Sequence, residues 1–265
     1  MGAWLNCPRS YYFRYIAKPR ITKTTWAHFS LGNSIHAALK KWWELPLEQR
    51  TEATAQELVK TSWQSGGYRD AEQSQRWLSL AQAMVASYVA DLDPRREPLS
   101  QERTMAFRTE HTIMEGRIDR LDDRGDEIVV VDYKTGKSVP DADTARSSEA
   151  LAMYALMVQR SLRLPCTRVE LHHLPSGQIA SWTHSQASLD SHLHRVESIS
   201  MDVRRARDTL EQLDDPDDSV LANLFPPSPS ALCGYCEYRA LCPDAQGDRK
   251  EPWAALQEEP TSSPD

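Results

Sequence analysis

The sequence predicts an α/β (mixed α+β) fold in which helices flank one central mixed β-sheet, and two observations predict it. Segments with the 3.6-residue spacing of apolar side chains lie before and after segments rich in β-branched residues. This order of helices, strands and helices is typical of a layered domain built on one sheet. The 265 residues, 40% of them hydrophobic, can bury a substantial core.

The first predicted helix covers residues 34–43, where Ile35, Ala38, Leu39, Trp42 and Trp43 fall on one face. The other predicted elements, in chain order, are a helix at about 73–92, strands at 103–109, 112–121 and 127–133, a helix at about 146–162, a hairpin of 167–174 and 178–184, and a helix at about 186–212. The turn DDRGD joins the second and third strands, which are therefore expected to pair.

Composition predicts one folded domain over residues 1–245 and an acidic tail over 246–265. The tail has few large apolar side chains, so disorder is expected there. No apolar stretch approaches about 20 residues, and the N-terminal residues lack the apolar core of a signal peptide. A cytoplasmic protein with no membrane partner is the expectation.

The net charge is −7, yet residues 1–43 contain no Asp or Glu and include the basic residues Arg9, Arg14, Lys18, Arg20, Lys23, Lys40 and Lys41. An acidic protein with one basic face can still bind phosphates locally. A merely solvated basic face accounts for this asymmetry equally well.

In the segment 128-IVVVDYKTGK-137 an apolar strand ends in Asp132 and Lys134, which share one face of that strand. The expected hairpin brings Asp119 from the preceding strand toward Asp132. Two close carboxylates repel each other, and a divalent cation such as Mg²⁺ or Mn²⁺ relieves the repulsion. A lysine beside that ion can stabilise charge on a phosphate. Asp-x-Lys alone is more often a strand that ends in a charged turn.

Three motifs in order, 32-GNSIH-36, 116-GRID-119 and 132-DYKTG-136, together with Tyr154 in an apolar helix, narrow this interpretation. They resemble the PD-(D/E)XK nuclease superfamily, and specifically its RecB-like exonuclease family, which is related to AddB-type and CRISPR-adaptation nucleases. The resemblance extends from Cys7 to Cys242 and implies a restriction-endonuclease-like core.

The resemblance also implies roles for individual residues. His36, Asp119, Asp132 and the backbone carbonyl of Tyr133 would bind the metal, Lys134 would be the catalytic lysine, and Tyr154 would line the site. Without the resemblance, His36 would be taken for a surface or capping residue beside an apolar stripe. Glu102 could match an acid that some relatives carry on the first strand.

One position departs from the family pattern. Where the family has Gln four residues before the tyrosine, this chain has Ala150, with Glu149 beside it. Either Glu149 replaces the glutamine after a small shift or that contact is lost, which affects rate and DNA positioning more than the metal site.

Five cysteines occur, and Cys233, Cys236 and Cys242 form the pattern C-x₂-C-x₅-C. Three thiols within ten residues suggest a metal or a cluster, and Cys7 is the natural fourth ligand. Zinc fits this spacing as well as iron–sulfur does, but the resemblance implies a 4Fe–4S cluster. Such a cluster would join the two ends of the chain and, by closing a long loop, could supply about 4–5 kcal/mol. Cys166 is expected to be a buried bystander.

The resemblance therefore implies a metal-dependent DNA exonuclease that acts on single-stranded DNA or DNA ends in repair or recombination. A CRISPR-adaptation nuclease shares these motifs and is the first alternative. A DNA-binding module that has lost catalysis is the second. The sequence has no G-x₄-G-K-[ST] pattern, so any helicase or ATPase motor would be a separate chain.

Overall fold

The computed structural model describes residues 2–256, which divide into two compact units. Thr25–Leu193, with Ala255 and Leu256, form the sheet unit, and residues 2–24 with His194–Ala254 form the terminal unit. The last nine residues of the predicted disordered tail, 257–265, lie outside the described residues. Among the described residues, no helix is both long enough and apolar enough to cross a membrane.

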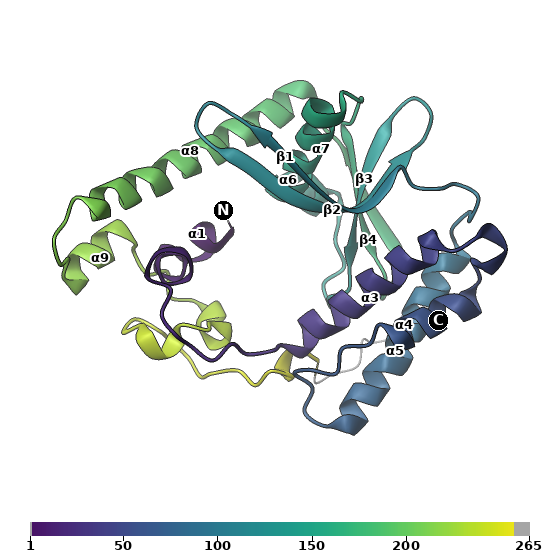
Figure 1. Cartoon of the computed structure of the whole chain (residues 1–265), viewed down its shortest axis with the longest axis horizontal. Coiled ribbons are helices and arrows are strands. Elements are labelled where there is room, and N and C mark those ends of the chain that lie inside the picture. The colour runs from purple at the N-terminus through teal and green to yellow at the C-terminus, as the bar shows by residue number, and fades with distance from the viewer. Residues whose placement is uncertain (1, 257–265) are drawn as a thin grey trace. The chain divides into compact units, whose positions relative to one another are not determined.

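The sheet unit contains one five-stranded sheet in the order β1-β2-β3-β4-β5 (Figure 1). The strands are β1 Ser100–Arg108, β2 Ile113–Asp123, β3 Ile128–Lys134, β4 Arg168–His173 and β5 Gln178–Thr183. The pair β3–β4 is parallel and the other three pairs are antiparallel. The predicted mixed sheet flanked by helices is confirmed, and so is the β2–β3 hairpin.

The central strand β3 explains why its sequence is so apolar. Residues 128–131 are all buried, as expected for a strand covered on both faces. Val129, Val131 and Tyr133 join the core formed with α3 Ala27–Glu44, α4 Glu52–Thr61 and α5 Ala71–Ala90. Because side chains alternate along a strand, Val130 and Asp132 face the other side. The helix α7 Glu149–Met157 packs against β2, β3 and β4.

Two helical predictions needed revision. The helix predicted at 146–162 is broken into α6 Ala142–Ser147, α7 and a π-helical turn, Val158–Leu162. The break falls at Ser148, whose hydroxyl accepts a hydrogen bond from the Leu151 amide and so starts a new helix. Helix α3 begins seven residues before the predicted start, and α4, which buries only Ala55 and Val59, was not predicted.

The terminal unit holds short helices at both ends of the chain. They are α1 Gly2–Asn6, α2 Pro8–Tyr11, the π-helix Tyr12–Ala17, α9 Asp218–Leu224 and two 3₁₀ turns, Ala231–Tyr235 and Arg239–Leu241. The long helix α8 Gln186–Glu211 begins in the sheet unit and ends here. The rings of Tyr12 and Phe225 lie 5.1 Å apart, and Phe13 stacks on Tyr238 at 5.5 Å. These N-terminal aromatic side chains therefore pack within the unit.

A buried histidine in the sheet unit makes stability depend on pH. His184 accepts or donates one hydrogen bond with Ser188 Oγ (2.9 Å), but its Nε2 has no hydrogen-bond partner among the described residues. Burial, and then the charge of His192, lower the pKa of His184 to about 4. In the unfolded chain His184 binds a proton near pH 6.5, whereas in the folded chain it binds that proton only near pH 4.

Stability is therefore expected to fall as the pH drops from 6.5 toward 4. Thermal unfolding of the wild type and of His184→Asn, which keeps a group for Ser188 but cannot be protonated, measures this contribution. The slope of Tm against pH should be smaller in His184→Asn. His194→Asn is the matched control because that side chain is 81% exposed. Equal slopes in all three proteins would contradict the assignment.

Candidate active site

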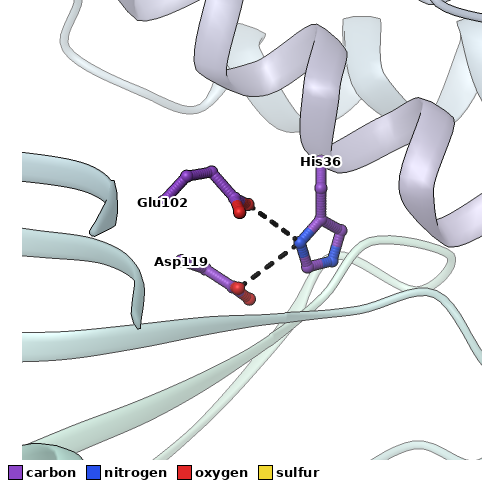
Figure 2. Close-up of side chains that lie close together, drawn as sticks. All are labelled: His36, Glu102 and Asp119. Atoms are coloured by element: carbon purple, nitrogen blue, oxygen red, sulfur yellow. Dashed lines mark hydrogen bonds and ion pairs between the residues drawn. The ribbon is translucent and has the colours of Figure 1, made fainter. Parts of the chain in front are cut away.

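Three side chains from three different elements lie close to one another. His36 from α3, Glu102 from β1 and Asp119 from β2 place their ligand atoms within 4.8 Å of one another (Figure 2). His36 Nδ1 lies 3.2 Å from Glu102 Oε1 and 3.4 Å from Asp119 Oδ1. The structure thus brings together two of the predicted ligands, His36 and Asp119, and adds Glu102.

The register of β1 and β2 sets the two acids opposite each other. Gln101 pairs with Arg120 and Arg103 pairs with Ile118, so Glu102 stands across from Asp119. Like charges in opposed positions are unfavourable. Glu102 also has φ of 44°, a left-handed conformation that costs a non-glycine residue about 1 kcal/mol or more. The fold maintains both costs at this one point, which is typical of a functional site.

Asp119 also lies where β2 and β3 separate. Their paired residues run from Asp123 and Ile128 to Arg120 and Val131. Beyond this point the Asp119 carboxylate accepts the Tyr133 amide hydrogen at 2.8 Å. One carboxylate oxygen is thereby fixed to β3 while the other faces His36.

Asp132 and Lys134 form an ion pair beside this group. Lys134 Nζ lies 2.5 Å from Asp132 Oδ2. Burial raises the pKa of Asp132, the charge of Lys134 lowers it, and the negative charge of Asp119 raises it again. The charges of Asp119 and Lys134 therefore both act on the pKa of Asp132. Its oxygens are not among the three ligand atoms that lie within 4.8 Å of one another. The carbonyl oxygen of Tyr133 remains a predicted ligand.

His36 is held as a cation by its neighbours. Burial alone lowers the pKa of His36, but hydrogen bonds and charge from Asp119 and Glu102 raise it to about 10. The imidazole also packs edge-on against the Tyr133 ring at 5.6 Å. A positive charge is thus required between Glu102 and Asp119. Carboxylate oxygens and one imidazole nitrogen are donors that suit Mg²⁺ or Mn²⁺, so these residues fit a divalent ion in place of the proton.

Tyr154 from α7 is close enough to sense the acids of the site. Burial raises the pKa of Tyr154, and the charges of Asp132 and then Asp119 raise it further. Its ring covers Gly116, where a Cβ atom would lie 2.5 Å from Tyr154 Cε1. The glycine of the GRID motif is therefore required by contact with the tyrosine.

This contact predicts the result of adding one methyl group. Gly116→Ala should displace the Tyr154 ring and lower any nuclease activity about tenfold, equivalent to about 1.4 kcal/mol. Tyr154→Ala should lower activity by a similar factor, and the double variant should lose no more than either single variant. Gly125→Ala is the control for replacing a glycine far from Tyr154, because a Cβ atom at this exposed turn would meet no other atom within 4 Å. The φ of +95° at Gly125 means that this control variant also loses some stability, which its Tm measures. Fully additive losses in Gly116→Ala/Tyr154→Ala would contradict the coupling.

Sequence reasoning gave too little weight to Glu102 and overlooked two supporting residues. Arg117 Nε lies 2.9 Å from Glu102 Oε2 and helps to hold that carboxylate. His173 Nε2 lies 2.7 Å from the Gly136 carbonyl and ties down the loop after Lys134. Alternation along β2 places Arg117 and Asp119 on one face, which was the available signal for Arg117. Ala150 is exposed in the first turn of α7.

The four cysteines predicted to hold a cluster, Cys7, Cys233, Cys236 and Cys242, all lie in the terminal unit and are free. The charge of Cys7 influences both Cys236 and Cys242, so these thiols share one neighbourhood. Over the described residues, however, the sulfur atoms do not form a cluster arrangement. Cys166 is fully buried, as predicted, and burial raises its pKa to about 12.

The mixed five-stranded sheet flanked by helices, with acids on its neighbouring strands β1, β2 and β3, is consistent with a restriction-endonuclease-like domain. The model of the PD-(D/E)XK nuclease superfamily matches residues 3–243, and the chain belongs to that superfamily. A crystal structure of a proposed exonuclease from Eubacterium rectale is similar, with a TM-score of 0.46, 12% identity, and coverage of 86% of this chain and 85% of that chain. The crystal structure of SSO0001 matches with a TM-score of 0.25 and 14% identity, covering 91% of this chain and 96% of that one. A comparison with curated proteins finds no match to this sequence.

Proposed function

We propose that this protein is a metal-dependent deoxyribonuclease that hydrolyses phosphodiester bonds as an exonuclease on single-stranded DNA or DNA ends. The observation that supports it most is the convergence of His36, Glu102 and Asp119 beside the Asp132–Lys134 ion pair. Membership in a nuclease superfamily supplies the reaction class. A role in DNA repair or recombination belongs to the same proposal, with any helicase motor on a separate chain.

In this proposal the acids and His36 hold Mg²⁺ or Mn²⁺. A bound ion of this kind supplies Lewis-acid polarisation of a phosphate and lowers the pKa of water. Asp119 is fixed by the Tyr133 amide, so its other oxygen, which faces His36, is already oriented toward the place of the ion. Lys134, which is 47% exposed, can leave Asp132 to orient water or to stabilise charge on the phosphate. Tyr154 of α7 lies against Gly116 and near the acids Asp132 and Asp119.

A 4Fe–4S cluster on Cys7, Cys233, Cys236 and Cys242 is the second part of the proposal. The shared neighbourhood of Cys7 with Cys236 and Cys242 supports it, and so does Arg9, whose guanidinium is buried with Nε unpaired among the described residues. A buried cation suits a site that collects several thiolates. Analysis of anaerobically purified protein should find about four irons per chain. One zinc ion per chain, without iron, would contradict the 4Fe–4S assignment and indicate a zinc site on the same cysteines.

The nuclease proposal is tested with end-labelled single-stranded DNA. The wild type should release mononucleotides or short products with Mn²⁺ or Mg²⁺, and an excess of chelator should stop the reaction completely. Ca²⁺, a larger ion with looser geometry, is the control metal and should support binding better than hydrolysis. DNA binding without hydrolysis under every metal would favour the binding module instead.

A further inference from the structure

Helix α3 carries a line of exposed side chains that runs through the candidate active site. Phe29, Asn33, His36 and Lys40 are spaced at i, i+4, i+7 and i+11, which places them along one face of a helix. Phe29, Asn33 and Lys40 are exposed, and His36 is half-buried against the acids. We call these four residues the α3 track. The opposite face holds the buried core residues Leu31, Ile35, Leu39 and Trp42.

Phe29 is the unusual member of the track. It is 61% exposed, the largest exposed fraction among the large hydrophobic side chains of the described chain. The His28 ring lies 4.3 Å from the Phe29 ring, and Trp26 lies 6.1 Å from His28. Because an exposed phenylalanine gains nothing from folding, a flat aromatic surface kept here suits a ligand with its own flat ring.

The track adjoins the loop that follows the catalytic lysine. Gly32 lies between Phe29 and His36 on the helix, and a Cβ atom there would lie 3.5 Å from Thr135 Oγ1. Thr135 follows Lys134 directly. The exposed face of α3 is therefore continuous with the site and is not a separate patch.

Helix geometry sets the distances along the track. At 1.5 Å per residue, Phe29 is about 10 Å along the axis from His36, and Lys40 is about 6 Å away in the other direction. Ten ångströms corresponds to about three nucleotides at the 3.4 Å rise of a strand with stacked, duplex-like geometry. Over residues 2–256, the Lys40 ammonium pairs with Glu44 at 3.9 Å and both side chains are exposed, so this ammonium can turn to a phosphate at little cost.

We propose that the α3 track binds single-stranded DNA, with Phe29 stacking on an unpaired base about three nucleotides from the scissile phosphate and Lys40 contacting the backbone on the other side of His36. The proposal rests on the nuclease function proposed above and specifies how that site holds its substrate. Stacking on Phe29 needs an unpaired base, so the track favours single strands over duplex DNA.

The test measures binding of a short fluorescein-labelled oligodeoxythymidylate to the full-length chain in chelator, by anisotropy. Phe29→Ala should raise the Kd about 5- to 100-fold, and Phe29→Trp should restore wild-type binding. Leu47→Ala, at another exposed apolar side chain (47% exposed), should leave the Kd unchanged. Lys40→Ala should reduce the dependence of log Kd on log salt by about 0.7, whereas Lys41→Ala, on a different face and bonded to Ser62, should not.

A second measurement separates stacking from a structural role. A single abasic site is moved along the oligonucleotide, and one position should weaken binding to the wild type. Phe29→Ala should not be weakened further by that same abasic site, because the stacked pair is already broken. Equal sensitivity of both proteins at every position would overturn the inference while leaving the nuclease proposal intact. A wild type that neither binds nor cleaves single-stranded DNA would overturn both.

Discussion

Asp132→Asn is expected to lower metal-dependent DNA hydrolysis by about 10²–10³-fold or more, with little change in fold. Asparagine keeps the shape of the side chain but has no charge. Asp132 forms an ion pair with Lys134 and lies close enough to Asp119 for the two carboxylates to interact, so it positions the Lys134 ammonium and adds negative charge beside Asp119. Loss of one negative charge weakens metal binding and leaves the Lys134 ammonium without its partner.

The assay is initial rate against Mn²⁺ concentration at fixed labelled single-stranded DNA, with Tm recorded for each protein. Part of the loss should be recovered at high Mn²⁺ if Asp132 holds the ion, since weaker binding is then offset by mass action. Asp126→Asn is the matched control because Asp126 lies exposed in the β2–β3 turn, only six residues away. A wild-type rate in Asp132→Asn would remove Asp132 from the mechanism and leave only the group around His36.

The sheet was predictable from sequence because its signals are local. The run Ile128–Lys134 and the turn before it contain enough information to define a buried strand and its hairpin partner. Asp119 could then be placed near Asp132 by register alone. Helix α4 was not predicted because its buried face consists of two small residues, which give a weak periodic signal in the sequence.

The position of Glu102 in the site could not be predicted from the residues around it. Its place in the site depends on a left-handed backbone conformation within β1 and on the distance of 66 residues to its partner His36. Neither leaves a pattern in the sequence around it. The resemblance suggested an acid on this strand, but only the pairing of β1 with β2 places it against Asp119.

Support for the site comes from a buried polar chain on the opposite face of the sheet, which begins at Glu170 on β4. Glu170 binds Arg124 through both oxygens (2.9 and 2.7 Å) and lies 3.0 Å from His172 Nε2. His172 Nδ1 lies 2.7 Å from the Tyr88 hydroxyl. Both Tyr88 and the hydroxyl of Tyr133 accept hydrogen bonds from Arg120, at 3.0 and 3.2 Å. The chain therefore ends on the residue whose amide fixes Asp119.

Glu170→Ala is expected to destabilise the protein by about 3 kcal/mol, because it removes the buried carboxylate that pairs with the buried His172 and with the partly exposed Arg124 and Arg168. For a chain of this size that corresponds to a fall in Tm of roughly 6–12 °C. Burial alone raises the pKa of Glu170, but hydrogen bonds and charge from His172 and Arg124 hold it well below the ordinary value. The charged form is thus favoured in the folded state, and its contribution is present above about pH 4.5 and lost as the pH falls further.

The measurement is thermal unfolding of wild type and Glu170→Ala at pH 7 and at pH 3.5. The difference in Tm should shrink at the lower pH, because the unfolded wild-type chain then binds a proton at Glu170 that the folded protein does not bind. Glu72→Ala is the control, since Glu72 is 78% exposed in its ion pair with Arg76 and should contribute under about 0.5 kcal/mol. If Glu170→Ala melted like Glu72→Ala, Glu170 would contribute no more than an exposed carboxylate, and Tyr133 would owe its position to packing against α3 and α5.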